Sequence, residues 1–183
     1  MTPRKYAALL RGINVGGNKK VPMAELRQVL EDLGHQDVRT YLQSGNAVFG
    51  SAERDTTALA RALEAAIEAH FGFRVPCLVV DGDHLRAVVD ACPFPAAELE
   101  GRQLHATFCS EQPGEERFSA IDAPAYLPEE FRVGDRVVYL HTPDGLGRSK
   151  LADVLARPAV VKGLDVTTRN WNTVVKLVEL TRD

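Results

Sequence analysis

The chain has 183 residues, of which 45% are hydrophobic and 26% are charged, and its formal net charge is −3. This is an ordinary globular composition, long enough for one large domain or two small ones. A slightly acidic chain is not expected to bind nucleic acid or a membrane surface along its whole length, because such proteins carry a basic excess. A local basic patch is compatible with this charge.

The cysteines and histidines predict no metal site. Cys77, Cys92 and Cys109 are odd in number and form no CxxC pair, so we expect buried free thiols in a reducing cytoplasm. The histidines show no HxxxH or HxH spacing, and no cofactor is predicted. The apolar run from Tyr6 to Leu10 is too short for a signal peptide, and no stretch is long enough to span a membrane. We therefore expect a cytoplasmic protein without a membrane partner.

The first half of the chain predicts the element order β-α-β-β-α-β. A first helix is expected from Pro22 to Gly34, and a long second helix ends at Gly72. Strands are predicted over residues 5–10, 38–42, 47–49 and 75–80. This order is the split-βαβ signature of the ferredoxin-like fold. Asp83 is then expected to cap a further helix that runs to Ala91.

The second half repeats this order after a proline-containing linker at residues 92–95. Strands are predicted over residues 104–109, 131–133, 136–140 and 166–169, and helices over 115–121, 149–156 and 171–180. Gly134-Asp135 is a typical two-residue hairpin turn. The sequence thus predicts an α+β fold of two tandem ferredoxin-like (α–β plait) units, each β-α-β-β-α-β plus a C-terminal helix, in domains 1–95 and 96–183.

A glycine-rich loop and a hairpin turn are predicted to share one edge of the first sheet. With strand order 4-1-3-2, the loop after the first strand and the turn after the second emerge together. Cations, amides and exposed backbone N–H groups beside a helix N-terminus are the ingredients of an anion site. The alternative is a tight connection with no ligand, although the length of the loop favours function. The candidate ligand-binding residues here are Arg11, Asn14, Gly16, Gly17, Lys20, Ser44 and Asn46.

A second polar edge is predicted in the second half, where the loop at residues 141–150 and the strand end at residues 169–170 emerge together. Ser149 is expected to cap the following helix, and Asn170 or Asn172 the last one. Capping does not explain basic residues at helix starts, because a helix N-terminus disfavours cations. The candidate ligand-binding residues of this edge are Lys150, Arg169, Asn170 and Asn172.

Known nucleotide-binding and catalytic motifs are incomplete. Gly12 and Gly17 have the spacing of a P-loop, but Asn18 and Lys19 follow where the motif requires Lys and then Ser or Thr. No GxGxxG occurs. His141 is a candidate base by position alone, and no nucleophile–base pair accompanies it, so no catalytic residue is assigned.

Three strings, LLRGINVGGNKKVPMAEL, YLQSGNAVF and TTRNWNTVVKL, resemble those of the bacterial domain-of-unknown-function family numbered 1697. The resemblance covers essentially the whole chain and implies two α–β plait domains. It implies no activity. By resemblance, the family's motif positions are Arg11, Gly12, Asn14, Gly16, Gly17, Lys20, Ser44, Gly45, Asn46, Arg169, Asn170, Trp171 and Asn172.

Three functions stay open from the sequence. The first is the binding of an anionic small molecule, phosphorylated or nucleotide-like, in a cleft between the two units. The second is an RNA-binding module with Tyr6 and Phe49 as stacking rings, although neither strand shows the RNP pattern. The third is a regulatory or oligomerising domain whose loops are structural and whose sheet edges pair with a partner. The sequence predicts neither an oligomeric state nor an enzymatic activity.

Overall fold

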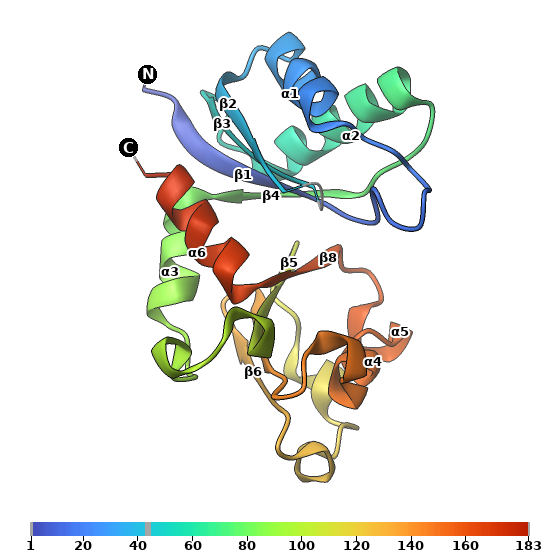
Figure 1. The fold of residues 1–183 in the computed structure, drawn as a ribbon, viewed down its shortest axis with the longest axis vertical. Helices are drawn as coiled ribbons and strands as arrows, with labels where there is room; N and C mark the ends of the chain where they lie inside the picture. The colour runs from blue at the N-terminus through green and yellow to red at the C-terminus, as the bar shows by residue number, and fades with distance from the viewer. Residues whose placement is uncertain (1, 43–44, 183) are drawn as a thin grey trace. The chain divides into compact units, whose positions relative to one another are not determined.

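The computed structural model describes residues 2–42 and 45–182 (Figure 1). The chain divides into two compact units: unit 1 comprises Met1–Arg86 with Leu177–Asp183, and unit 2 comprises Ala87–Lys176. Each unit contains a four-stranded antiparallel sheet and helices, so the fold class is α+β. The domain boundary predicted between residues 95 and 96 stays a prediction. No helix among the described residues is long and apolar enough to cross a membrane.

The sheet of unit 1 has the strand order β2-β3-β1-β4, which is the order used above to place the loops. Its strands are β1 (Arg4–Leu10), β2 (Gln36–Tyr41), β3 (Asn46–Ser51) and β4 (Cys77–Asp81). Its helices are α1 (Met23–Asp32) and α2 (Thr56–Phe71), which Figure 1 shows on the same side of the sheet. Two further helices, α3 (Gly82–Asp90) and α6 (Trp171–Leu180), each contain residues of both units.

The core of unit 1 lies between its sheet and the two helices α1 and α2. Alternate residues of β1, namely Tyr6, Ala8 and Leu10, are fully buried in this core. Leu30 of α1 and Leu63 of α2 pack in the same cluster. Because side chains alternate along a strand, every second residue of β1 faces the helices. Burial of this apolar surface fixes β1 at the centre of the sheet, and with it the point where the glycine-rich loop begins.

The ends of the helices follow their capping residues. Asp55 caps α2 by accepting hydrogen bonds from two main-chain N–H groups. The helix ends at Gly72, as the sequence predicts, and this glycine has the left-handed conformation. The predicted cap of α3 is wrong by two residues. Asp81, rather than Asp83, accepts the N–H of His84 at 2.7 Å. Asp83 already lies inside the first turn of α3.

The sheet of unit 2 has the strand order β6-β7-β5-β8. Its strands are β5 (Leu104–Cys109), β6 (Glu130–Gly134), β7 (Val137–His141) and β8 (Val166–Asn170). The helices α4 (Lys150–Leu155) and α5 (Pro158–Val161) precede β8. The turn between β6 and β7 is one residue later than predicted, at Asp135 and Arg136, and Arg136 has a φ of +52°.

Unit 2 departs from the predicted element pattern between β5 and β6. The α-helix predicted over residues 115–121 is replaced by two 3₁₀ helices, Glu115–Phe118 and Ala123–Tyr126. Pro113 precedes the first of these 3₁₀ helices and Pro124 lies inside the second, and the segment lacks the 3.6-residue apolar repeat that stabilises an α-helix. The predicted linker also contains short 3₁₀ helices, at Ala96–Glu98 and Gly101–Gln103.

Candidate anion-binding site

Three connections of unit 1 are hydrogen-bonded to one another at one edge of its sheet. The loop after β1 contacts both the β2–β3 turn and the segment between α2 and β4. The bonds that join them run from Leu10 N–H to Gly45 O (2.8 Å), from Arg11 N–H to Pro76 O (3.0 Å) and from Lys19 Nζ to Arg74 O (2.9 Å). We call the described residues of these connections, 11–22, 42, 45 and 72–76, the basic edge.

The basic edge carries cations and no acidic side chain. Its charged residues are Arg11, Lys19, Lys20 and Arg74. The first acidic residue of the chain is Glu25, whose carboxylate lies 3.2 Å from Nε2 of His70. Within the part of the chain that the structure describes, the exposed side chains of Arg11 and Lys20 form no hydrogen bond or ion pair. These two cations are therefore available to an external anion.

The tip of the glycine-rich loop is a small hairpin. Val15 and Asn18 form an antiparallel bridge around Gly16 and Gly17. The two glycines have φ values of +59° and +78°, and a turn with two such residues is the type that Gly-Gly adopts without strain. A Cβ added to either glycine would meet no atom within 4 Å. The backbone at this tip is therefore open to an approaching ligand.

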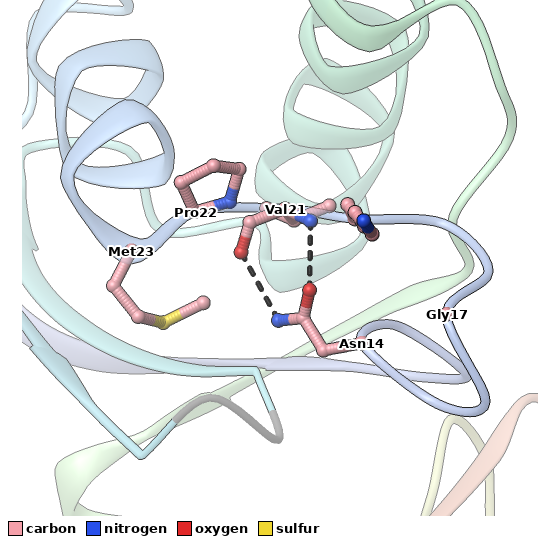
Figure 2. A pocket seen from close by; sticks show the side chains of 6 residues that line it. Asn14, Gly17, Val21, Pro22 and Met23 are labelled. Atoms are coloured by element: carbon pink, nitrogen blue, oxygen red, sulfur yellow. Dashed lines mark hydrogen bonds between the residues drawn. The ribbon is translucent and has the colours of Figure 1, made fainter.

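Asn14 closes the base of the loop. Its Nδ2 donates to the Val21 carbonyl at 3.0 Å, and its Oδ1 accepts the Val21 N–H at 2.9 Å (Figure 2). The main-chain N–H of Asn14 also donates to Lys19 O at 3.1 Å. The side-chain amide of Asn14 thus makes the pair of hydrogen bonds that a residue of a neighbouring strand would make, and it holds the two ends of the loop together. Its contribution to a site is to position the loop.

A cavity of about 370 Å³ lies between the loop base and the start of α1 (Figure 2). The residues that line it are Asn14, Gly17, Lys20, Val21, Pro22 and Met23. Pro22 occupies the N-cap position of α1 and has no side-chain capping bond. The first N–H groups of a helix have no partner within the helix, and they give its N-terminus a partial positive charge. This cavity therefore lies beside a helix N-terminus and has Lys20 in its wall.

The β2–β3 candidates have structural contacts where the structure describes them. Asn46 is fully buried, and its Nδ2 donates to Tyr41 O at 3.0 Å, so it ties the ends of the turn together. Gly45 has a φ of +93°, and a Cβ there would lie 2.8 Å from the Leu10 Cβ. Ser44 lies outside the described residues.

The two rings considered for RNA stacking are core residues. Tyr6 and Phe49 are 0% and 1% exposed, and their ring centroids lie 5.7 Å apart. The hydroxyl of Tyr6 donates to the carbonyl of Glu53 at 2.6 Å. Recognition of RNA by an RRM needs aromatic rings that single-stranded bases can reach. These two rings are buried in the core of unit 1, where a nucleic-acid base cannot stack on them.

The start of α4 in unit 2 already holds a negative group. Ser149 caps the helix as predicted, because its Oγ accepts the Ala152 N–H at 2.9 Å. The carboxylate of Glu129 accepts hydrogen bonds from the Ser149 hydroxyl and, at 3.3 Å, from the Leu151 N–H. The anion that we expected beside Lys150 is thus supplied by the chain itself. Glu129 was missed because it is 20 residues away in the sequence.

Arg169 is held within unit 2. Its Nη1 donates to the hydroxyl of Thr167 at 2.7 Å and to the carbonyl of Thr168 at 3.0 Å. Burial lowers the pKa of Arg169 to about 10, because the charged guanidinium is largely removed from water. These contacts indicate a role in tying down the end of β8.

The two asparagines near the start of α6 differ in role. Asn170 caps the helix, since its Oδ1 accepts the Thr173 N–H at 2.9 Å. Asn172 lies against the main chain of Gly101, where an added Cβ would come within 2.3 Å of the Asn172 Nδ2. The sequence had left open which of the two is the cap.

The cysteines offer little reactivity. Cys77 and Cys109 are buried, and Cys92 is half-buried. Burial raises the pKa of all three thiols, that of Cys109 to about 11, so little thiolate forms at neutral pH. Among the described residues, no group of three or more His, Cys, Asp or Glu side chains is placed to hold a metal ion.

Comparison with family models supports the resemblance carried by the first two of the three sequence strings given above. The family model described as "Protein of unknown function (DUF1697)" matches residues 3–139. The chain belongs to this family. The match includes the whole glycine-rich loop, whereas the string around Arg169 lies outside it. The resemblance predicted from the sequence is thereby confirmed.

Among solved structures, the chain is similar to the conserved bacterial protein SP0830 from Streptococcus pneumoniae. The two are 24% identical, the similarity covers 98% of this chain and 99% of that one, and the TM-score is 0.71. At this identity the likeness concerns the fold alone. No curated protein sequence matches the chain at a significant level.

Proposed function

We propose that unit 1 binds a small anionic molecule, phosphorylated or nucleotide-like, at its basic edge. The observation that carries the proposal is the cavity beside the uncapped N-terminus of α1, with Lys20 in its wall and no acidic residue on the edge. A helix N-terminus and an amine both favour negative charge. Arg11, on the same edge, adds a second available cation.

The cavity has the size and the mixed lining of a small-molecule site. Ligand pockets measure roughly 300–1,000 Å³ and combine apolar walls with a few polar groups. Here the apolar wall comes from Val21, Pro22 and Met23, and the polar groups come from Asn14 and Lys20. A phosphate held by Lys20 and the helix N-terminus would leave the organic part of the molecule against the apolar wall.

We also propose that each unit is ferredoxin-like, which is the architecture used to place these loops. We further propose that the protein is cytoplasmic. The two sheet orders, β2-β3-β1-β4 and β6-β7-β5-β8, support the first statement because both follow the 4-1-3-2 pattern. The sharing of one cleft with the Arg169 edge stays a prediction from the sequence.

A ligand panel on matched variants tests the proposal. Inorganic phosphate, pyrophosphate, AMP, ATP and citrate are titrated by calorimetry into the wild type, Lys20→Ala, Arg11→Ala and the control Arg61→Ala. Arg61 is exposed on α2, outside the basic edge, so its removal changes the net charge equally. We expect at least one phosphate compound to bind, and each edge variant to weaken it roughly two- to fivefold.

The control variant should bind like the wild type, and added salt should weaken binding by screening. Two results would contradict the proposal. One is the absence of binding by every anion in the panel. The other is an equal loss of affinity in Arg61→Ala and Lys20→Ala, which would indicate a response to net charge rather than a site.

A further inference from the structure

Unit 2 contains two buried polar atoms without a hydrogen-bond partner. They are Nδ1 of His105 and Oγ1 of Thr142. The two residues are 6% and 1% exposed. A buried polar group without a partner is costly, and native proteins nearly always satisfy such groups with protein atoms or bound water. Both atoms therefore need an explanation.

The strand register brings these two atoms to one place. His105 of β5 lies opposite Leu140 of β7, and the Thr142 N–H donates to Gln103 O at 2.8 Å. Thr142 is thus opposite Gln103, which directly precedes β5 and is two positions before His105 in the chain. Residues opposite one another in an antiparallel sheet point to the same face, so His105 and Thr142 share a face as diagonal neighbours.

The spacing of such a pair suits one bridging molecule. Diagonal neighbours are about 7–8 Å apart at the backbone and somewhat less at Cβ. Neither of the two atoms forms a hydrogen bond with the other. A single oxygen atom about 2.8 Å from each of two partners can join atoms that are up to roughly 5.5 Å apart.

The polar groups of the neighbouring residues have other partners. Gln103 donates from Nε2 to Pro143 O at 3.2 Å and accepts the Glu100 N–H through Oε1. The carbonyl of Thr142 accepts the Gly145 N–H at 2.9 Å. These groups of Gln103 and Thr142 thus have partners of their own, and a bound molecule is one way to satisfy both unpaired atoms.

The bound molecule is expected to be neutral. The nearest cation of the adjacent strand, Arg169, lies opposite Ala106, so its side chain is on the other face of the sheet. Burial lowers the pKa of His105, which keeps its ring uncharged at neutral pH. An anion would have no counter-charge here, whereas a small molecule that both donates and accepts would satisfy both atoms.

We propose that His105 and Thr142 form an internal binding site for one water molecule, which bridges Nδ1 of His105 to Oγ1 of Thr142. The bridge joins the start of β5 to the connection between β7 and α4. Two to four polar partners and a polar site are what buried water requires, and water-mediated bonds are nearly as favourable as direct ones. The site is separate from the basic edge of unit 1.

The test compares three variants by thermal unfolding. Thr142→Val keeps the shape of the side chain and removes its hydroxyl, and Thr142→Ser keeps the hydroxyl. The control is Thr181→Val, because the buried hydroxyl of Thr181 donates to Leu177 O at 2.7 Å. If water bridges the pair, Thr142→Val should lower the melting temperature by about 2–4 °C, as should the control.

The proposal would be overturned by a Thr142→Val variant that is not destabilised. If the hydroxyl of Thr142 is truly unpaired, Thr142→Val should melt at or above the temperature of the wild type, which would overturn the proposal. A high-resolution crystal structure of the wild type gives a second measurement that does not depend on the folding of a variant. We expect electron density for one oxygen atom within 3.2 Å of both side-chain atoms, and its absence would also overturn the proposal.

Discussion

Replacing Asn14 with alanine should destabilise the protein by opening the base of the glycine-rich loop. The substitution removes two hydrogen bonds to the main chain of Val21, at 2.9 and 3.0 Å. At about 0.5–1.5 kcal/mol each, their loss costs about 1–3 kcal/mol. Asn14 also has a φ of +55°, a left-handed conformation that costs alanine about 1 kcal/mol more than asparagine. The total of about 2–4 kcal/mol lowers the melting temperature by about 4–16 °C.

Urea denaturation followed by circular dichroism measures this change, and a second variant separates its two causes. Asn14→Gly also loses both hydrogen bonds but accepts a positive φ without strain. We therefore expect its loss of stability to be smaller than that of Asn14→Ala by about 1 kcal/mol. If Asn14→Ala unfolds at the urea concentration of the wild type, the amide does not hold the loop, and the reasoning is refuted.

Three further predictions follow from other contacts. Gly45→Ala should destabilise the protein by about 2–4 kcal/mol, because a Cβ at a φ of +93° would lie 2.8 Å from the Leu10 Cβ; a melting temperature within 2 °C of the wild type would contradict it. Arg169→Ala should melt well below Arg11→Ala, since only Arg169 is tied to its own strand; calorimetry of the two variants would show equal melting if this assignment were wrong. Burial lowers the pKa of His35 and His105, so the unfolded chain binds protons more tightly than the folded protein. The free energy of unfolding is therefore at its full value above pH 6.5 and falls as the pH decreases below it. Urea midpoints that agree at pH 7.5 and 5.5 would argue against this.

Much of unit 1 could be predicted from the sequence because its signals are local. The buried run of β1 and the terminating Gly72 each act within a few residues, and they are observed where they were expected. The α3 cap failed because Asp81 and Asp83 are chemically identical candidates two residues apart. Only the three-dimensional path of the chain decides between them.

Unit 2 was harder to predict because its elements depend on distant contacts. The segment between β5 and β6 was predicted to contain an α-helix, but it contains prolines, which disfavour an α-helix, and it forms two 3₁₀ helices. The partner of Ser149 is Glu129, which no local pattern indicates. Sequence composition alone therefore could not show that Glu129 contacts the start of α4.

The candidate site shows the same limit at the level of single residues. Lys19 and Lys20 are indistinguishable in the sequence, yet Lys19 donates to Arg74 O while Lys20 lines the cavity. Asn14 was expected to contact a ligand; its amide binds Val21, and the residue also lines the cavity. Charge and composition thus selected the loop that the proposal uses, whereas the division between supporting and available side chains required the fold.

The N-terminus of a helix has different polar partners in the two units, and this difference favours a ligand at unit 1 rather than at unit 2. At the start of α4, the hydroxyl of Ser149 and the carboxylate of Glu129 satisfy the helix N-terminus from within the chain. At the start of α1, Pro22 provides no side-chain cap, and the carboxylate of Glu25 in the first turn lies 3.2 Å from Nε2 of His70. Lys20 lies in the wall of the cavity. A helix N-terminus that faces a cation gains nothing for stability. The arrangement becomes favourable when an external anion takes the place that Glu129 occupies in unit 2.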